Sequence, residues 1–357
     1  MNTKKLIHSI LTDKNLSVDE KYKKIIELFP DYLQNKEIKK AIYEKIEWIF
    51  HDWLWTYFEL LVYDNLVDYF NLKQEKTEKE LTLNKINEAK ILYNKFFPSN
   101  EYKINFDLEV ENIEQAAKQV INYIKDSLPT NTIIKITHSA QDFRKWNARD
   151  VFITFDDWKV LNLSLKVDKS WKVALFDGQT SDIFNKVYNR YFNLSKQDYE
   201  NLKQELFGTT DESKIFKDFQ NVALLNQEVL IKQLGLENVE INDFSKAVIT
   251  NKENLKYLIS QLKRYKKSDD NSIVVVVDRI SGKLWWNTIL DEIDENNLDL
   301  NNFSFTPTKP RSYKYATEPW IKFKWKTFVS FQTKHKRWNQ SSSKFWDITI
   351  RLRTTWK

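Results

Sequence analysis

Three polar residues between positions 150 and 166 have the types and spacing that could support hydrolysis of a phosphodiester bond. Asp150 opens one stretch of alternating apolar and polar residues, and Ser164 and Lys166 belong to the next. A carboxylate can bind a divalent cation, and a lysine beside it can stabilise the negative charge that develops on a phosphate. Ser164 has no histidine near it in the sequence to act as its base, so we interpret it as a neutral residue of the site rather than a nucleophile.

The elements that must position these residues can be predicted from hydrophobic periodicity. Residues 149–155 and 159–167 alternate with period two, which predicts two strands joined by a hairpin at 156–158. Alternation puts Ser164 and Lys166 on one face, and the hairpin can bring Asp150 beside them. The surrounding pattern predicts a helix at 111–128, a strand at 132–137, a helix at 180–192 and a buried strand at 272–280.

This arrangement resembles the core of the PD-(D/E)xK nucleases, most of all the type II restriction endonucleases. The core of that superfamily runs helix, three strands, helix, strand, so the resemblance implies an α/β (α+β) fold with a mixed sheet. Asp150 matches the first acid of the motif and Lys166 its lysine. The position two before the lysine is normally Asp or Glu, and here it is Ser164. Some restriction endonucleases have a neutral residue there, but the departure puts a second metal ion in doubt.

The resemblance also implies a set of metal ligands and roles. Mg²⁺ would be held by Asp150 and the backbone carbonyl of Leu165, and Lys166 would stabilise the attacking hydroxide. A carboxylate of the preceding helix often assists in this family; Glu114 is the nearest match, and Glu111 is the second choice. The structural alternatives are ordinary: Asp150 as a strand-start cap, Lys166 as a solvated lysine, and Glu114 as a helix-surface carboxylate.

The C-terminal section is strongly basic. Residues 309–357 contain 13 Lys and Arg and 2 Asp and Glu, a net charge of +11, so the rest carries −5 of the chain's total of +6. A basic section on an acidic body is typical of a protein that binds a polyanion, although a solvated lysine-rich surface is the alternative. Side chains here and after the predicted hairpin are candidates for holding and reading DNA: Gln179, Thr180, Lys324, Gln332, Lys334, Lys336, Arg337, Arg351 and Arg353.

The tail also alternates as strands. In its first strand Lys322, Lys324 and Lys326 are expected to share a face. Combined with the helical periodicity near the N-terminus, this predicts three consecutive regions. They are a helical region at 1–105, a nuclease-like core at 106–300 and a basic β-rich region at 301–357. Ser17 and Glu20 predict a capping box at the start of one N-terminal helix.

Composition excludes several classes of site. The chain has no cysteine, and its four histidines are scattered, so disulfides, thiolate metal sites and a His-rich zinc site are not expected. The N-terminus lacks the apolar core of a signal peptide. The most apolar stretch, 48–70, contains several acidic residues and is expected to be a buried helix rather than a membrane span. We therefore expect a cytoplasmic protein without a membrane partner.

Glycine is scarce and tryptophan abundant, at 4 and 13 residues, although glycine usually makes up about 7% of a protein. Some bacterial lineages read the codon UGA as tryptophan and others as glycine. We hypothesise that nine codons here are UGA and that the natural protein has glycine at them; the alternative is that all the tryptophans are genuine. UGG codons at Trp158 and Trp171 would exclude the hypothesis. The nine positions are Trp146, Trp158, Trp171, Trp285, Trp286, Trp325, Trp338, Trp346 and Trp356.

Together these features predict a sequence-specific, Mg²⁺-dependent endonuclease that hydrolyses double-stranded DNA, as the resemblance implies for a restriction–modification system. The resemblance further implies a homodimer and a cognate DNA methyltransferase as genetic partner. The serine at position 164 leaves open a second function, a non-catalytic DNA-binding protein with a degenerate nuclease fold. A third is a repair or recombination nuclease that recognises DNA structure rather than sequence.

Overall fold

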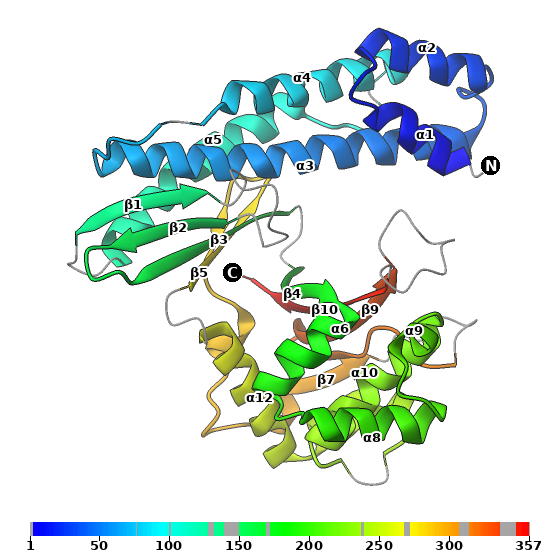
Figure 1. Ribbon diagram of the computed structural model, residues 1–357, viewed down its shortest axis with the longest axis vertical. Coiled ribbons are helices and arrows are strands. Elements are labelled where there is room, and N and C mark those ends of the chain that lie inside the picture. The colour runs from blue at the N-terminus through cyan, green and yellow to red at the C-terminus, as the bar shows by residue number, and fades with distance from the viewer. Residues whose placement is uncertain are drawn as a thin grey trace. The chain divides into compact units, whose positions relative to one another are not determined.

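The computed structural model divides the chain into two compact units that are not consecutive in sequence. Unit 1 comprises residues 1–169 and 271–285, and unit 2 comprises residues 170–270 and 286–357. Figure 1 shows the helices and strands of both units. The structure describes residues 3–75, 77–99, 101–127, 132–138, 150–168, 172–236, 239–267, 272–306, 314–335 and 348–356.

Unit 1 combines an N-terminal set of helices with a five-stranded mixed sheet. The capping box of Ser17 and Glu20 is confirmed, and the side chain of Asn35 caps the longest helix. The elements are α1 (Thr3–Thr12), α2 (Val18–Leu28), α3 (Lys36–Tyr69), α4 (Lys79–Phe96), α5 (Phe106–Ser127), β1 (Ile133–His138), β2 (Asp150–Phe155), β3 (Val160–Asp168), β5 (Ser272–Asp278) and β6 (Leu284–Trp285).

The sheet of unit 1 has the strand order β1-β2-β3-β5-β6. Strands β1, β2 and β3 form an antiparallel meander, and β5 lies parallel to β3 on its other side. Helix α3 packs against all three strands of the meander and against α5, as Figure 1 shows. Leu163 and Leu165 of β3 and Val151 and Ile153 of β2 are fully buried, as the predicted alternation requires.

The free edge of β1 is covered by the loop that follows α3. Gln74 acts like a strand residue: its Nε2 donates to the carbonyl of Ile136 at 2.7 Å, and its Oε1 accepts from the Ile136 N–H at 2.8 Å. An exposed strand edge invites pairing with other chains, and a side chain that occupies its donor and acceptor removes that opportunity. Gln74 therefore closes this side of the sheet.

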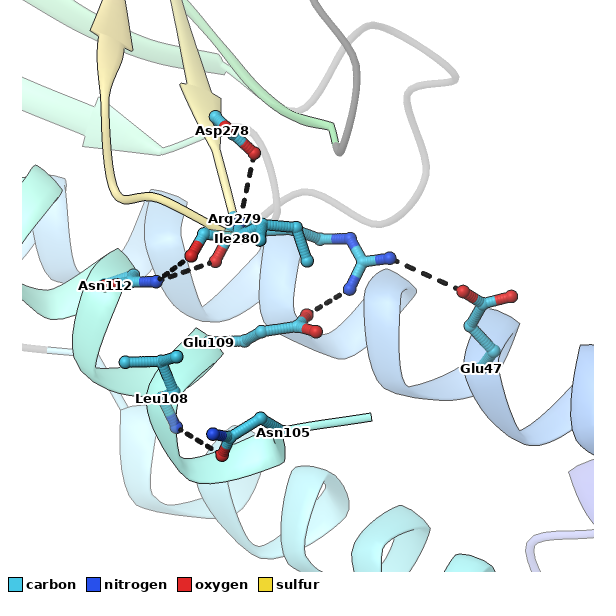
Figure 2. Close-up of polar contacts among 8 residues, drawn as sticks. All are labelled: Glu47, Asn105, Leu108, Glu109, Asn112, Asp278, Arg279 and Ile280. Atoms are coloured by element: carbon cyan, nitrogen blue, oxygen red, sulfur yellow. Dashed lines mark hydrogen bonds and ion pairs between the residues drawn. The ribbon is translucent and has the colours of Figure 1, made fainter. Parts of the chain in front are cut away.

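The hairpin between β5 and β6 is fixed to the helices by a buried polar network (Figure 2). Arg279, only 4% exposed, forms ion pairs with Glu109 of α5 and, at 3.4 Å, with Glu47 of α3. Asn112 of α5 donates from Nδ2 to the carbonyls of Arg279 and Ile280, at 3.1 and 2.7 Å. The network thus ties the end of β5, the strand that lies parallel to β3, to helices α3 and α5.

Unit 2 is built from short helices around a second five-stranded sheet. The segment predicted as a helix at 180–192 is helical, with a π-helical turn in its middle. The elements are β4 (Lys172–Gln179), α6 (Thr180–Asp182), η2 (Ile183–Tyr188), α7 (Asn189–Tyr191), α8 (Lys196–Phe207), α9 (Glu212–Ile215), α10 (Phe219–Gln233), η3 (Ile241–Asp243), α11 (Phe244–Thr250), α12 (Lys252–Lys267), η4 (Ile289–Glu292), η5 (Leu300–Asn302), β7 (Phe303–Thr306), β8 (Trp320–Phe323), β9 (Lys326–His335) and β10 (Ile348–Thr355).

The sheet of unit 2 is antiparallel, with the order β4-β10-β9-β8-β7. Helix α10 packs against β9 and β10, and α11 packs against β7 and β8. Ile348, Ile350 and Leu352 are buried in the core of this unit, as the alternation of the tail predicts. Among the described residues of the whole chain, none of the helices has both the length and the apolar character to span a membrane.

One sequence expectation about the tail is wrong, and one strand of its sheet was not expected. Lys322, Lys324 and Lys326 do not share one strand, because the chain reverses at Lys324 and Trp325 between β8 and β9. Both turn residues have positive φ, at 45° and 71°, as a type I′ hairpin requires. Strand β4 was not expected, and it extends this sheet beside β10.

Trp158 and Trp325 occupy backbone positions that suit glycine. The carbonyl of Phe155 accepts from the Trp158 N–H at 2.9 Å, and the Phe155 N–H donates to the carbonyl of Lys159 at 3.0 Å. This is a tight turn followed by a residue with positive φ, where glycine is usual; the φ of Trp158 is 63°. The two tryptophans are 79% and 92% exposed, so neither offsets the backbone cost by packing.

The other described positions of the glycine hypothesis do not behave in this way. Trp285 and Trp356 are 7% and 1% exposed, and neither has a positive φ. Trp286 is half-buried. Their local geometry gives no reason to prefer glycine. Four positions lie outside the described residues: Trp146, Trp171, Trp338 and Trp346.

Candidate functional site

The β2–β3 pair brings together the backbone positions that the sequence singled out. Asp150 and Ser164 are register partners on the two antiparallel strands, and Lys166 is the second residue after Ser164 on β3. Ser164 and Lys166 are half-buried, whereas the intervening Leu165 is fully buried. The side of β3 that carries these two residues is therefore partly accessible to solvent. The side chain of Asp150 lies outside what the structure describes.

A tryptophan of α3 fixes the backbone between the two polar residues. Trp55 donates from Nε1 to the carbonyl oxygen of Leu165 at 2.8 Å. This is the carbonyl that the resemblance assigns to the metal, and the contact uses one of its two lone pairs. Trp55 thus holds the strand in place at the site. Sequence reasoning missed it, because one tryptophan in an apolar helix gives no sign of a backbone contact 110 residues away.

The helix carboxylates have other surroundings. Glu114 accepts a hydrogen bond from the hydroxyl of Tyr57 at 2.7 Å. Burial raises the pKa of Tyr57, and the hydrogen bond to Glu114 raises it further, so the phenol remains a proton donor. Glu111 and Glu114 line a surface pocket together with Lys90 and Asp107. The hydrogen bond of Glu114 thus runs to α3, and none of the described contacts brings it to Ser164 or Lys166.

A buried acid–base pair lies behind the start of β2. The Nε2 of His138, the last residue of β1, lies 3.4 Å from Oε2 of Glu59 on α3, and both side chains are fully buried. His138 is the register partner of Val151, the residue after Asp150, and the ring of Tyr63 meets it edge-on. Such a pair is costly to bury and is tolerated only in a well-defined geometry. It fixes the end of β1 beside the residue that follows Asp150.

The described residues hold no cluster of three or more His, Cys, Asp or Glu side chains that could bind a metal ion. This statement does not extend to the side chain of Asp150. Within the part of the site that is described, the oxygen donors are the Ser164 hydroxyl and the Leu165 carbonyl. They are hard ligands of the kind that Mg²⁺ accepts together with water and phosphate oxygens.

In unit 2, four of the residues proposed to contact DNA lie close together on one sheet. Arg351 of β10 is the register partner of Gln332 on β9, and Lys334 pairs with Thr349. Arg353 lies two residues beyond Arg351 on the same strand. All four are half-buried, and the alternation that buries Ile350 and Leu352 places these residues on the other face of the sheet. We call this set the polar face: Gln332, Lys334, Arg351 and Arg353.

Among the side chains that the structure describes, one carboxylate enters the polar face. Glu318, 9% exposed, accepts from Oγ of Ser330 at 3.0 Å and from Nε2 of Gln332 at 3.0 Å. Its carboxylate also lies 3.6 Å from Nη1 of Arg353. Sequence reasoning missed Glu318, because it precedes a proline in a short irregular segment without periodicity.

The remaining candidates are placed differently. Thr180 is 2% exposed and donates from its hydroxyl to the carbonyl of Ile348 at 2.9 Å, so it joins α6 to β10 and is not accessible to DNA. Lys324 is exposed at the tip of the β8–β9 hairpin. Gln179 is the register partner of Thr349, but its side chain is outside what is described. Lys336 and Arg337 lie outside the described residues altogether.

Comparison with known proteins identifies no relative: no family model, curated protein or solved structure matches the chain. In unit 1 a cation and a hydroxyl stand beside the backbone position of an aspartate. In unit 2 cations and an amide share one sheet face.

Proposed function

We propose that the protein is a Mg²⁺-dependent, sequence-specific endonuclease that hydrolyses double-stranded DNA, as a type II restriction endonuclease does. The observation that carries the proposal is the register of β2 and β3. Asp150 and Ser164 are direct partners there, and Lys166 is two residues further on the same strand. A PD-(D/E)xK motif requires its first acid, its second position and its lysine in this relationship.

The topology around the pair supports the same proposal. A helix, α5, precedes the antiparallel meander, and a further strand, β5, lies parallel to the lysine-bearing strand. This agrees with part of the order that the resemblance implies. The second helix of that core was expected at 180–192, but it belongs to unit 2, whose residues 170–270 are inserted between β3 and β5.

The residues of the site have distinct tasks in this proposal. When bound, Mg²⁺ would neutralise charge on the scissile phosphate and lower the pKa of water. Asp150 and the second lone pair of the Leu165 carbonyl would hold it. Lys166 would place its ammonium group beside the phosphate and stabilise the charge that develops as the P–O bond breaks. Ser164 would offer a neutral oxygen where the motif normally has a carboxylate, and this favours a single metal ion.

The polar face supports DNA as the substrate. Lys334, Arg351 and Arg353 supply positive charge for phosphates, and Gln332 supplies an amide that can contact a base edge. A homodimer and a cognate methyltransferase belong to the proposal as the companions of such an enzyme, since a two-fold DNA site matches a two-fold protein.

Digestion of unmethylated plasmid tests the proposal and separates it from its alternatives. Discrete fragments in Mg²⁺ and none in EDTA are expected. If the protein retards a DNA duplex on a gel but leaves the plasmid intact, the result would instead favour the non-catalytic DNA-binding protein. Ser164 would then be the reason for the lost cleavage. Cutting only at branched or damaged DNA would favour a structure-specific repair nuclease.

A further inference from the structure

We infer that Glu318 is a positioning residue that sets the base specificity of the polar face, and that it leads Gln332 to recognise an exocyclic amino group on a base. The inference rests on the proposed function, because it presumes that the polar face contacts duplex DNA. Glu318 itself would not touch the DNA. It would act through the side chains that its carboxylate holds.

The segment that carries Glu318 is fixed from both sides. Beside β9, the carbonyls of Thr317 and Pro319 accept from the N–H groups of Thr333 and Phe331, at 2.7 and 3.2 Å. These bonds extend the pairing of β8 with β9 to residues that precede the start of β8. The carboxylate is therefore carried on a backbone that is tied directly to the strand of Gln332.

On its other side the same segment is held by amide side chains from the helical layer. Gln220 accepts from the Tyr315 N–H, and Asn242 accepts from the Ala316 N–H, both at 2.9 Å. Gln227, 1% exposed, donates to the carbonyl of Ala316 at 2.7 Å. Three amide side chains hydrogen-bond to this short irregular segment and restrict its backbone. The position of Glu318, its one acidic residue, is therefore well defined.

The carboxylate decides which way the amide of Gln332 points. A charged carboxylate only accepts hydrogen bonds, and Arg353 at 3.6 Å favours its charged form. Its 3.0 Å partner on Gln332 must therefore be the nitrogen, as the structure has it. The amide oxygen is then directed away from Glu318. Without the carboxylate the two ends of the amide would be interchangeable.

An amide of fixed polarity distinguishes bases. In the major groove, adenine N6 and cytosine N4 are amino groups that donate, whereas thymine O4 and guanine O6 accept. The oxygen of Gln332 can accept from an amino group and is repelled by a keto oxygen. We therefore expect the position read by Gln332 to require adenine or cytosine on the contacted strand.

The same carboxylate lowers the net positive charge of the polar face. Glu318 contributes one negative charge among Lys334, Arg351 and Arg353, and its carboxylate pairs with Arg353 at 3.6 Å. Binding that depends on phosphate charge is independent of sequence, so a carboxylate that offsets one cation lowers affinity for unrelated DNA. Glu318 would thus act on specificity in two ways, through the amide and through charge.

Selection from a random pool of DNA duplexes, bound in EDTA so that nothing is cut, tests the inference. The variants are Glu318→Gln and Gln332→Leu. Glu205→Gln is the matched control, because it makes the same charge change at an exposed residue of α8, paired with Lys232 at 3.6 Å. A thermal melt of each variant accompanies the selection. The salt dependence of binding to one unrelated duplex is measured as well.

The wild type is expected to select one defined base pair at one position or more. Glu318→Gln should lower that preference about tenfold and steepen the salt slope on unrelated DNA by about one. Gln332→Leu should lower the same preference and leave the slope unchanged, and it carries the test if Glu318→Gln does not fold. Glu205→Gln should keep the preference.

Two results would overturn the inference in distinguishable ways. In the first, the wild type selects a sequence, and Glu318→Gln and Gln332→Leu fold and select that sequence with the same preference. Glu318 then has no part in specificity, and the proposed function stands. If the wild type binds no duplex, or binds without any preference, the proposed function fails and the inference fails with it.

Discussion

Asp150 and Ser164 are register partners across the antiparallel strands β2 and β3. Cross-strand partners have Cβ atoms about 4.5–5.5 Å apart, close enough for two side chains to share one metal ion. Most nucleases of the PD-(D/E)xK type have a carboxylate at both positions, so this chain lacks one of two expected negative charges. The proposed site therefore lacks one carboxylate, and a substitution at position 164 can supply it.

Ser164→Asp should strengthen metal binding, because it adds a carboxylate opposite Asp150. We expect the Mg²⁺ concentration for half-maximal cleavage to fall about tenfold, in line with the effect of ligand charge on such sites. A Mg²⁺ titration of plasmid cleavage measures it. Asn162→Asp, two residues earlier on β3 and also half-buried, is the control. Equal effects of the two variants would show that Ser164 is not at the metal.

Trp158→Gly and Trp325→Gly should each stabilise the protein. Both residues have positive φ and are largely exposed, and this conformation costs a residue with a side chain about 1–2 kcal/mol. Trp285→Gly and Trp356→Gly should instead destabilise it by about 3–5 kcal/mol, because buried rings would be lost. Urea denaturation of the four variants measures the free energies. Destabilisation by Trp158→Gly and Trp325→Gly would remove the structural support for glycine at these codons.

The sequence allowed the local elements near the site to be predicted, because their periodicity is strong. Strands β2 and β3 and the pairing of Asp150 with Ser164 follow from alternation and one hairpin turn. Strand β5 could be predicted as a strand, since four consecutive valines are typical of a buried parallel one. That it pairs with β3 across an intervening unit could not be predicted, because no local pattern encodes contacts over so many residues.

The errors have equally specific causes. Lys322, Lys324 and Lys326 satisfy the alternation of a single strand, but Trp325 conceals a turn that glycine would have signalled. Glu114, a candidate by its position on a helix, accepts a hydrogen bond from Tyr57, and its role at a metal stays a prediction. Glu318 and Trp55 act through contacts that depend on the tertiary fold, so neither carries a sequence signal.

Arg279→Met should destabilise unit 1 by about 3–5 kcal/mol, because it removes the cation that is paired with the buried carboxylate of Glu109. Replacing both residues, Arg279→Met with Glu109→Leu, should recover much of the loss. Denaturant melts give the free energies of unfolding. Arg264→Met, at an exposed position of α12, is the control and should change the free energy by less than about 0.5 kcal/mol. A double variant no better than the single one would contradict this account of the network.

Lys45 should make stability depend on pH. Burial lowers the pKa of Lys45 to about 7, although Asp52 opposes the shift, whereas the unfolded value is 10.5. Its ammonium group lies 3.3 Å from the centroid of the Trp48 ring, a contact too weak to offset burial. Between these pKa values the unfolded chain binds a proton that the folded chain has released, so this contribution to stability rises with pH above 7 and is flat below it.

The stability difference between the wild type and Lys45→Met isolates this effect. Urea denaturation at several pH values between 6 and 9 should show a difference that moves in favour of the wild type as the pH rises above about 7. A difference independent of pH would mean that Lys45 keeps its proton in the folded protein.

The central claim is that Lys166 acts on the scissile phosphate, and cleavage of plasmid by Lys166→Ala tests it most directly. Lys135→Ala, at an exposed lysine of β1 in the same sheet, serves as the matched control, and duplex binding in EDTA is measured beside it. We predict discrete Mg²⁺-dependent fragments from the wild type and Lys135→Ala. For Lys166→Ala we predict a loss of about 10²–10⁴ in rate with DNA binding retained. Undiminished cleavage by Lys166→Ala would contradict the account.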